Sequence, residues 1–151
     1  MTRINSAIAV KSLTDEHLFA EHREIKRLPQ CLLTSLRRNC PLRIPKRFTL
    51  GRGHVSFFYD KMTFTFKRFQ EIHAECLKRG FNVTDFSENW DKLGGACGNP
   101  FYWDDYAPTE TERVLLVERI TERIRGSKKP CFHYYGEPIA KERAVEILNE
   151  L

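Results

Sequence analysis

The sequence predicts an all-α fold: a single compact domain of three main helices plus a short C-terminal helix, with long ordered loops. The 151 residues suffice for one domain that buries about two-thirds of its unfolded surface. Apolar residues recur at helical spacing in several segments that also carry helix-start and helix-end signals. The best strand candidate, HVSFFY at 54–59, has no second strand of equal strength to pair with, so we expect an ordered loop there.

The first helix is expected to begin at Thr14, in the stretch TDEHLFAEHREIKRLPQCLLTSLRR. Acidic residues occupy its first turn and arginines its end, as the helix dipole favours. Its apolar residues recur at helical spacing, at Leu18, Ile25, Leu28 and Leu32. Because a proline inside a helix lacks the N–H donor and crowds the preceding turn, Pro29 should kink this helix or split it near Leu28.

Two further main helices have clear ends. The second is expected over about 63–79, followed by Gly80, a suitable left-handed cap. The third should begin at Thr109, which forms a capping-box pattern with Glu112, and it should end before Gly126.

The rest of the chain is expected to be loops and a terminal helix. The stretches 39–62 and 82–108 are rich in Gly, Pro, Asn and aromatic residues, and the density of aromatic residues indicates order rather than disorder. A helical extension over 139–151 should pack on the core of the same domain rather than on a partner. One domain therefore accounts for residues 1–151.

The charge of the chain is unevenly distributed. Residues 1–52 carry eleven Lys and Arg against four Asp and Glu, in a chain of net charge +5. Such a basic half attracts polyanions, nucleic acid first and anionic membranes second, although charge alone is equally compatible with a solvated basic face. No apolar run is long enough for a membrane helix or typical of a signal peptide, so we expect a cytoplasmic protein, associated with the nucleoid or encoded by a virus or phage.

The five cysteines indicate reduced thiols. They form no CxxC pair and no cluster with histidine at metal-ligand spacing. Neither a disulfide framework nor a metal site is therefore predicted.

The terminus MTRIN offers a nucleophile. The residue after Met1 is small enough for methionine removal, which would leave a free α-amine on Thr2. An α-amine has a pKa near 7.7–8.0, so about 10–20% is unprotonated at neutral pH, and such an amine forms Schiff bases with aldehydic carbons. The alternative is an ordinary chain end without function.

Glu24 is the candidate acid/base group on the first predicted helix. It lies between Arg23 and Arg27, which are i, i+4 neighbours, and it shares a stripe with His17 and Glu21. A carboxylate in a positive, phosphate-binding environment can transfer protons next to DNA. An exposed charged helix face with simple ion pairs is the alternative.

Five motifs together resemble one family. MTRIN, HLFAEHREIKRL at 17–28, LGRGHVSFFYDK at 50–61, AECLKRGFN at 74–82 and HYYG at 133–136 resemble, in the same order, the pyrimidine-dimer DNA glycosylase family typified by phage endonuclease V. The similarity extends to about Ala140.

The resemblance implies a bifunctional enzyme. It implies a DNA glycosylase with a coupled abasic-site (β-elimination) lyase activity on pyrimidine dimers in UV-damaged double-stranded DNA, acting as a monomer without cofactor. Thr2 matches the nucleophile of the family and Glu24 its essential acidic residue. The implied DNA-binding residues are Arg3, Arg23, Arg27, Arg119 and Arg123. Candidate substrate contacts are His17 and His22.

Departures from the family pattern concern the choice of lesion. His22 stands where the phage enzyme has tyrosine, and PCFHYYG at 130–136 has phenylalanine and cysteine in place of a tryptophan-led aromatic run. Two alternatives therefore stay open: a related glycosylase or lyase for oxidised, ring-opened or abasic sites, and a non-catalytic DNA-binding module. His54 is expected to be hydrogen-bonded within its loop rather than catalytic.

Overall fold

The computed structural model describes residues 4–150 and confirms the predominantly α-helical fold. The helices are α1 (Asp15–Ile25), α2 (Arg27–Arg37), α3 (Met62–Lys78), α4 (Glu88–Ala96), α5 (Glu110–Gly126) and α6 (Lys141–Asn149). The strands are β1 (Phe132–Tyr134) and β2 (Glu137–Ile139), and 3-10 turns cover Val10–Ser12, Ser56–Phe58 and Pro100–Tyr102. Within the described residues, no helix is long and apolar enough to cross a membrane.

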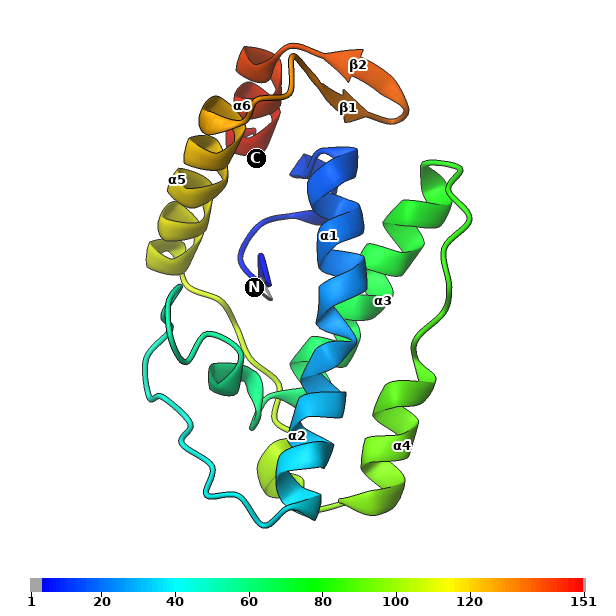
Figure 1. Ribbon diagram of the computed structural model, residues 1–151, viewed down its shortest axis with the longest axis vertical. Helices are drawn as coiled ribbons and strands as arrows, with labels where there is room; N and C mark the ends of the chain where they lie inside the picture. The colour runs from blue at the N-terminus through cyan, green and yellow to red at the C-terminus, as the bar shows by residue number, and fades with distance from the viewer. Residues whose placement is uncertain (1–3, 151) are drawn as a thin grey trace.

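The helices α1 and α2 follow each other through the middle of the molecule (Figure 1). The helix α3 packs on α1 and α4 packs on α2, while α5 lies on the other side of α1. The segment that precedes α1 passes between α1 and α5 (Figure 1). The two faces of α1 therefore have different surroundings. One face packs on α3, and the other faces α5 and the N-terminal segment.

The break between α1 and α2 confirms the effect predicted for Pro29. The first helix ends at Ile25, Lys26 forms a turn, and the second helix starts at Arg27. Pro29 has no N–H to donate to the carbonyl of Ile25, so the chain loses one hydrogen bond of a continuous helix at this point. The capping box of Thr109 and Glu112 is also present, with both of its hydrogen bonds formed.

Two elements lie where the sequence predicted none. The expected loop 82–108 contains α4, a short helix whose sequence ENWDKLGGA holds two glycines that weaken the helical signal. Trp90 and Leu93 are buried, α4 packs on α2, and the Trp90 ring contacts Phe69 of α3, which together stabilise this helix. The prediction of an uninterrupted loop was therefore wrong here.

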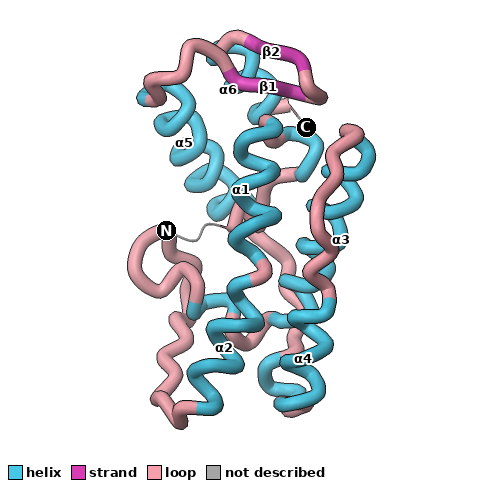
Figure 2. Tube along the Cα trace, turned by 45° about the vertical axis from the view of Figure 1, so that its right-hand side comes forward, coloured by secondary structure: helices cyan, strands magenta, loops and turns pink. Residues whose placement is uncertain are grey.

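The second correction is a β-hairpin, β1–β2, which caps the upper end of the molecule (Figure 2). Its two turn residues, Tyr135 and Gly136, have φ angles of 52° and 80°, as the tight turns of two-residue hairpins require. Asp15 accepts hydrogen bonds from the backbone N–H groups of both turn residues, at 3.1 and 2.8 Å. The hairpin is thus fixed by a tertiary contact with the start of α1, which short-range sequence patterns do not reveal.

The C-terminal helix α6 packs on the domain as expected. Ala144 and Leu148 belong to the hydrophobic core, and Ile147 is also buried. Its neighbours are α5, β1 and the turn Val10–Ser12. The expected ordered loop at HVSFFY is likewise present, with Phe57 and Phe58 buried in a 3-10 turn.

Candidate nucleic-acid-processing site

A cleft of about 250 Å³ lies between α1 and α5. It brings together five predicted site residues: His17, Arg23, Glu24, Arg119 and Arg123. Two of these belong to a helix that starts some ninety residues after α1, so the fold assembles this group. Two further hollows, of about 520 and 700 Å³, share lining residues with the cleft, and Arg123 borders both.

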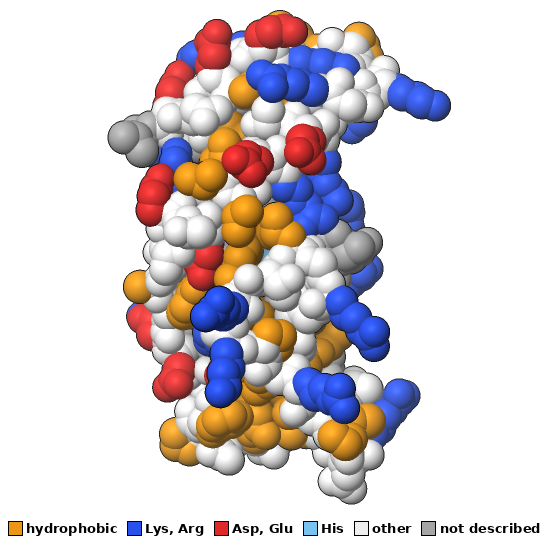
Figure 3. All heavy atoms as spheres, turned by 90° about the vertical axis from the view of Figure 1, so that its left-hand side faces the viewer, with side chains coloured by type: hydrophobic (Ala, Val, Ile, Leu, Met, Phe, Trp, Pro, Cys, Tyr) orange, Lys and Arg blue, Asp and Glu red, His pale blue; other side chains and the backbone are white. Residues whose placement is uncertain are grey.

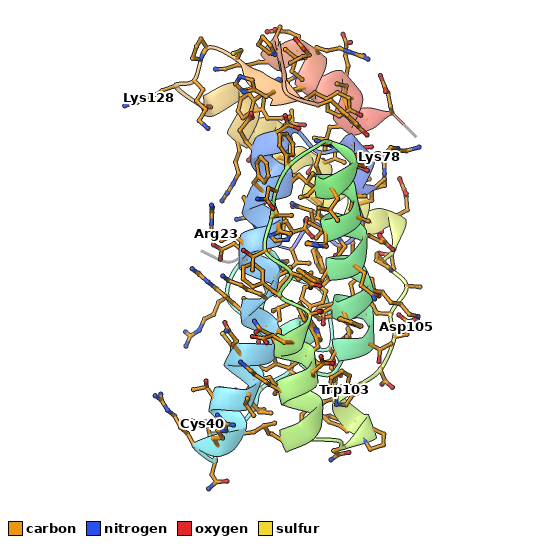
Figure 4. The ribbon with its side chains drawn as sticks, turned by 90° about the vertical axis from the view of Figure 1, so that its right-hand side faces the viewer. Arg23, Cys40, Lys78, Trp103, Asp105 and Lys128 are labelled. Carbon is orange, nitrogen blue, oxygen red and sulfur yellow. The ribbon has the colours of Figure 1, made fainter. Side chains whose placement is uncertain are left out.

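Positive charge surrounds the cleft. Figure 3 shows many Lys and Arg side chains along one edge of the molecule and others at the upper end and over the lower half, with most Asp and Glu side chains along the opposite edge and at the upper end. In Figure 4, Arg23 projects from α1 on the side of the molecule opposite to Lys78 and Asp105. A polyanion approaching this edge would meet cations first.

Glu24 is the carboxylate within this cationic cleft. Its side chain is 15% exposed, and Arg27 donates a 2.9 Å hydrogen bond to its Oε2. Arg23 Nε lies 3.7 Å from its Oε1. Arginines therefore lie on both flanks of this carboxylate, a side chain that can serve as a general acid/base group.

Glu21 lies one turn earlier but has a different environment. It is buried, and Arg68 of α3 donates two hydrogen bonds to its carboxylate, at 2.8 and 3.0 Å. The remaining Nη1 of Arg68 donates to the carbonyl of Ile8 at 2.6 Å. Glu21 therefore serves in an internal ion pair, although it borders the cleft.

His17 borders the cleft from the first turn of α1. Its Nδ1 lies 2.7 Å from Oγ1 of Thr14, and its ring stacks on Phe132 at 5.7 Å between centroids. Burial, followed by the nearby charges of Arg123 and Lys129, lowers the pKa of His17 to about 4. The imidazole is therefore neutral at physiological pH and held in one orientation.

His22 points away from the cleft. It is buried between α1 and α3, where its Nε2 lies 3.1 Å from Nδ1 of His73 and its ring contacts Phe69 and Phe86. Burial, His73 and Lys26 lower its pKa to about 4. The structure thus separates His22 from the other candidate site residues.

The two arginines of α5 share one face, as their i, i+4 spacing predicts. Arg119 donates a 3.0 Å hydrogen bond from Nη1 to the carbonyl of Leu50. Burial, and then the charge of Arg123, lower the pKa of Arg119. Among residues 4–150, neither arginine forms an ion pair with a carboxylate. An incoming phosphate would relieve the repulsion between them.

Asn5 is a cleft residue that the sequence analysis did not single out. It is 7% exposed, and it lines the cleft together with Glu24. Its carboxamide carries both a donor and an acceptor, so it is suited to bind a polar group that enters the cleft. Its place in MTRIN, one of the motifs quoted above, was the available signal.

His54 is hydrogen-bonded within its loop, as expected, but it also reaches the N-terminal segment. Its Nδ1 lies 2.8 Å from the carbonyl oxygen of Thr49, and its Nε2 accepts a 3.0 Å hydrogen bond from the N–H of Ile4. The side chain is 2% exposed. The predicted nucleophile Thr2 and the predicted DNA contact Arg3 lie outside the described residues. Within residues 4–150, no group of three or more His, Cys, Asp and Glu side chains could hold a metal ion.

A helical domain with a carboxylate set in a cationic cleft has the features expected of proteins that bind a polyanionic backbone and carry out acid/base chemistry on it. Residues 1–89 match the family model described as pyrimidine dimer DNA glycosylase. This match covers more than half of the chain, and the chain belongs to that family. It is thus one of the DNA-repair glycosylases, and damaged DNA is its partner. The match includes Glu24 and His54, whereas Arg119 and Arg123 join the site through the fold.

Proposed function

We propose that the protein removes the damaged base of a pyrimidine dimer in duplex DNA and then cuts the strand by β-elimination, with the Thr2 α-amine as nucleophile and Glu24 as the acid/base group. One observation carries this proposal: Asn5 and Glu24 border the same cleft. Thr2 is three residues before Asn5, so their Cα atoms are at most about 11 Å apart. Chain connectivity therefore limits how far the amine can lie from the cleft, which supports a reaction that uses both groups.

The reaction follows from these two groups. The neutral amine attacks the anomeric carbon of the damaged nucleotide, the N-glycosidic bond breaks, and its electron pair leaves with the base, which takes up a proton. The sugar ring opens to an imine between Thr2 and the deoxyribose. Glu24 stabilises the cationic sugar and then takes a proton from the adjacent carbon. The electrons of that C–H bond form a double bond and expel the 3′ phosphate, which cuts the strand.

The cations around the cleft would hold the phosphates. Arg23, Arg27, Arg119 and Arg123 surround Glu24, and Arg3 is proposed to join them. The end of α2 and the loop after it are proposed to extend this surface, because residues 37–52 carry six exposed cations and no carboxylate. These are Arg37, Arg38, Arg43, Lys46, Arg47 and Arg52. Each phosphate contact releases counterions, so binding should depend steeply on salt.

The substrate is proposed to be bent duplex DNA. A stacked base pair shields the sugar carbon, so the enzyme must bend the helix and displace a nucleotide. A lesion that already weakens stacking lowers this cost. We propose that the protein acts as a monomer in the cytoplasm of its cell or host.

Borohydride trapping tests the proposal. Incubating the protein with duplex DNA that contains one abasic site, in the presence of borohydride, should give a covalent adduct that mass spectrometry maps to Thr2. A protein that only binds DNA would give no adduct, which would refute the proposal. Duplexes with a cyclobutane dimer or an oxidised base then define the lesion, and a preference for the oxidised duplex would replace the pyrimidine dimer as substrate.

A further inference from the structure

The N-terminal segment Ile4–Ile8 is held at both ends. The N–H of Ile4 donates to Nε2 of His54 at 3.0 Å, and the carbonyl of Ile8 accepts from Nη1 of Arg68 at 2.6 Å. Both isoleucine side chains lie in the hydrophobic core. Between them, the carbonyl of Asn5 accepts a 3.0 Å hydrogen bond from the N–H of Ile8. The backbone path that leads towards Thr2 is thus fixed from Ile4 onwards.

The hydrogen bonds of His54 define its tautomer. The carbonyl of Thr49 can only accept, so the Nδ1 atom 2.8 Å away carries a proton. The N–H of Ile4 can only donate, so Nε2 carries the lone pair. The ring is also held edge-on by Phe48 and Phe58, with centroids 5.5 Å away in both cases. His54 is therefore a neutral, oriented acceptor for one particular backbone N–H.

We infer that His54 is a positioning residue for the proposed reaction: through the N–H of Ile4 it holds the segment that presents the Thr2 amine to the cleft. The inference rests on the proposed function. From a fixed Ile4, the Cα of Thr2 can move over a radius of at most about 7 Å. Without this hydrogen bond only the packing of the Ile4 side chain holds this end of the segment, so the amine can reach a larger volume. Small misplacements of a reacting group of about 1 Å can cost roughly 100-fold in rate.

The same loop also contacts the phosphate-binding face. Arg119 donates a hydrogen bond to the carbonyl of Leu50. The carbonyl of the preceding residue, Thr49, accepts a hydrogen bond from His54. The loop segment 49–54 thus joins α5 to the N-terminal segment. DNA bound at Arg119 and the amine positioned through Ile4 would therefore both be held by this loop segment.

Two substitutions distinguish the hydrogen bond of His54 to Ile4 from its hydrogen bond to Thr49 within the loop. His54→Gln retains an acceptor near the position of Nε2 for the N–H of Ile4. His54→Asn retains a donor near the position of Nδ1 for Thr49 but does not reach Ile4. The control is His73→Gln, which removes a histidine on α3 that contacts His22 and not the cleft.

The measurement is the single-turnover rate of borohydride-trapped adduct formation on abasic duplex, together with the Kd for a duplex that holds a non-cleavable abasic analogue. We expect His54→Asn to slow adduct formation about 10- to 100-fold with the Kd within about twofold, and His54→Gln to lie closer to the wild type. The control should match the wild type. Equal rates for all variants, or rescue by Asn and not by Gln, would overturn the inference.

Nuclear magnetic resonance of the wild-type protein gives a second test that needs no substitution. The nitrogen shifts of His54 should show a protonated Nδ1 and an unprotonated Nε2, and the Ile4 amide should exchange slowly with solvent. A protonated Nε2 or a rapidly exchanging Ile4 amide would overturn the inference even if the enzyme is active. Absence of any adduct from the wild-type protein would instead overturn the proposed function, which keeps the two failures distinct.

Discussion

Arg68 of α3 donates two hydrogen bonds, of 2.8 and 3.0 Å, to the carboxylate of Glu21. Glu24, three residues later, instead borders the cleft and accepts a hydrogen bond from Arg27. The two carboxylates occupy neighbouring turns of one helix and carry the same charge. Their partners differ, since Glu21 is tied into the interior and Glu24 borders a space that a substrate can enter. This difference allows their roles to be separated by matched substitutions.

Replacing Glu24 by Gln should stop strand cleavage while sparing DNA binding. The amide cannot take the proton from the sugar, and loss of a general acid/base group typically costs about 100- to 10,000-fold in rate. Cleavage of abasic duplex and its Kd should both be measured. Glu71→Gln, an exposed position on α3, is the control. Wild-type cleavage by Glu24→Gln would show that another group is the base.

Replacing Glu21 by Gln should destabilise the fold. It leaves the buried charge of Arg68 without its counter-charge, and breaking a buried ion pair in this way costs about 3–5 kcal/mol. Urea unfolding monitored by circular dichroism would give the loss. The same measurement on Arg143→Gln, which removes two exposed ion pairs, with Glu146 and Glu150, should change the unfolding free energy by less than about 1 kcal/mol. An unfolding free energy of Glu21→Gln equal to that of the wild type would mean that the ion pair with Arg68 makes no net contribution to stability.

Retaining Met1, or adding an N-terminal tag, should abolish borohydride trapping. Either change moves the reactive amine away from Thr2 and places a residue where the deoxyribose should bind. A tag at the C-terminus serves as the control and should leave trapping intact. Full trapping by a chain with a blocked α-amine would identify a different nucleophile, which peptide mapping would reveal.

Replacing Arg123 by Gln should reduce the salt dependence of DNA binding. If the guanidinium contacts one phosphate, the slope of log K against log salt should fall by about 0.9. Binding isotherms at four or five salt concentrations give this slope. Lys92 on α4 pairs with Glu88, and Lys92→Gln is the matched control that should keep the wild-type slope. An unchanged slope for Arg123→Gln would remove it from the interface.

Acidification should destabilise the protein through His22. Burial, followed by His73 and Lys26, lowers its pKa in the folded state from 6.5 to about 4. The unfolded chain therefore binds more protons between these values, so the unfolding free energy is fully retained above pH 6.5 and falls towards pH 4. A shift of this size corresponds to roughly 3 kcal/mol.

The measurement for His22 is urea unfolding at several pH values between 7 and 4.5. His22→Phe removes the titrating group and keeps an aromatic ring, so the stability of this variant should fall less over that range. Equal pH dependence in His22→Phe and the wild type would show that His22 is not the cause.

The sequence by itself determined the features that depend on neighbours within one or two turns. Thr14 caps α1, Thr109 and Glu112 form the capping box of α5, and Pro29 accompanies the break before α2. Capping bonds and the missing proline donor act over a few residues, so local patterns are enough to predict them. The pairing of Arg119 with Arg123 on one face follows from helical spacing in the same way.

Only the tertiary structure decided which residues meet across the chain. In the folded chain Glu21 pairs with Arg68, and His22 contacts His73. Asn5 lines the same cleft as Glu24, and His54 accepts a hydrogen bond from Ile4. The tertiary structure also stabilised α4 and the β1–β2 hairpin, whose local signals are weak. The partners in most of these contacts are about fifty residues apart or more, and such packing depends on how whole helices are oriented, which the spacing within one helix does not encode.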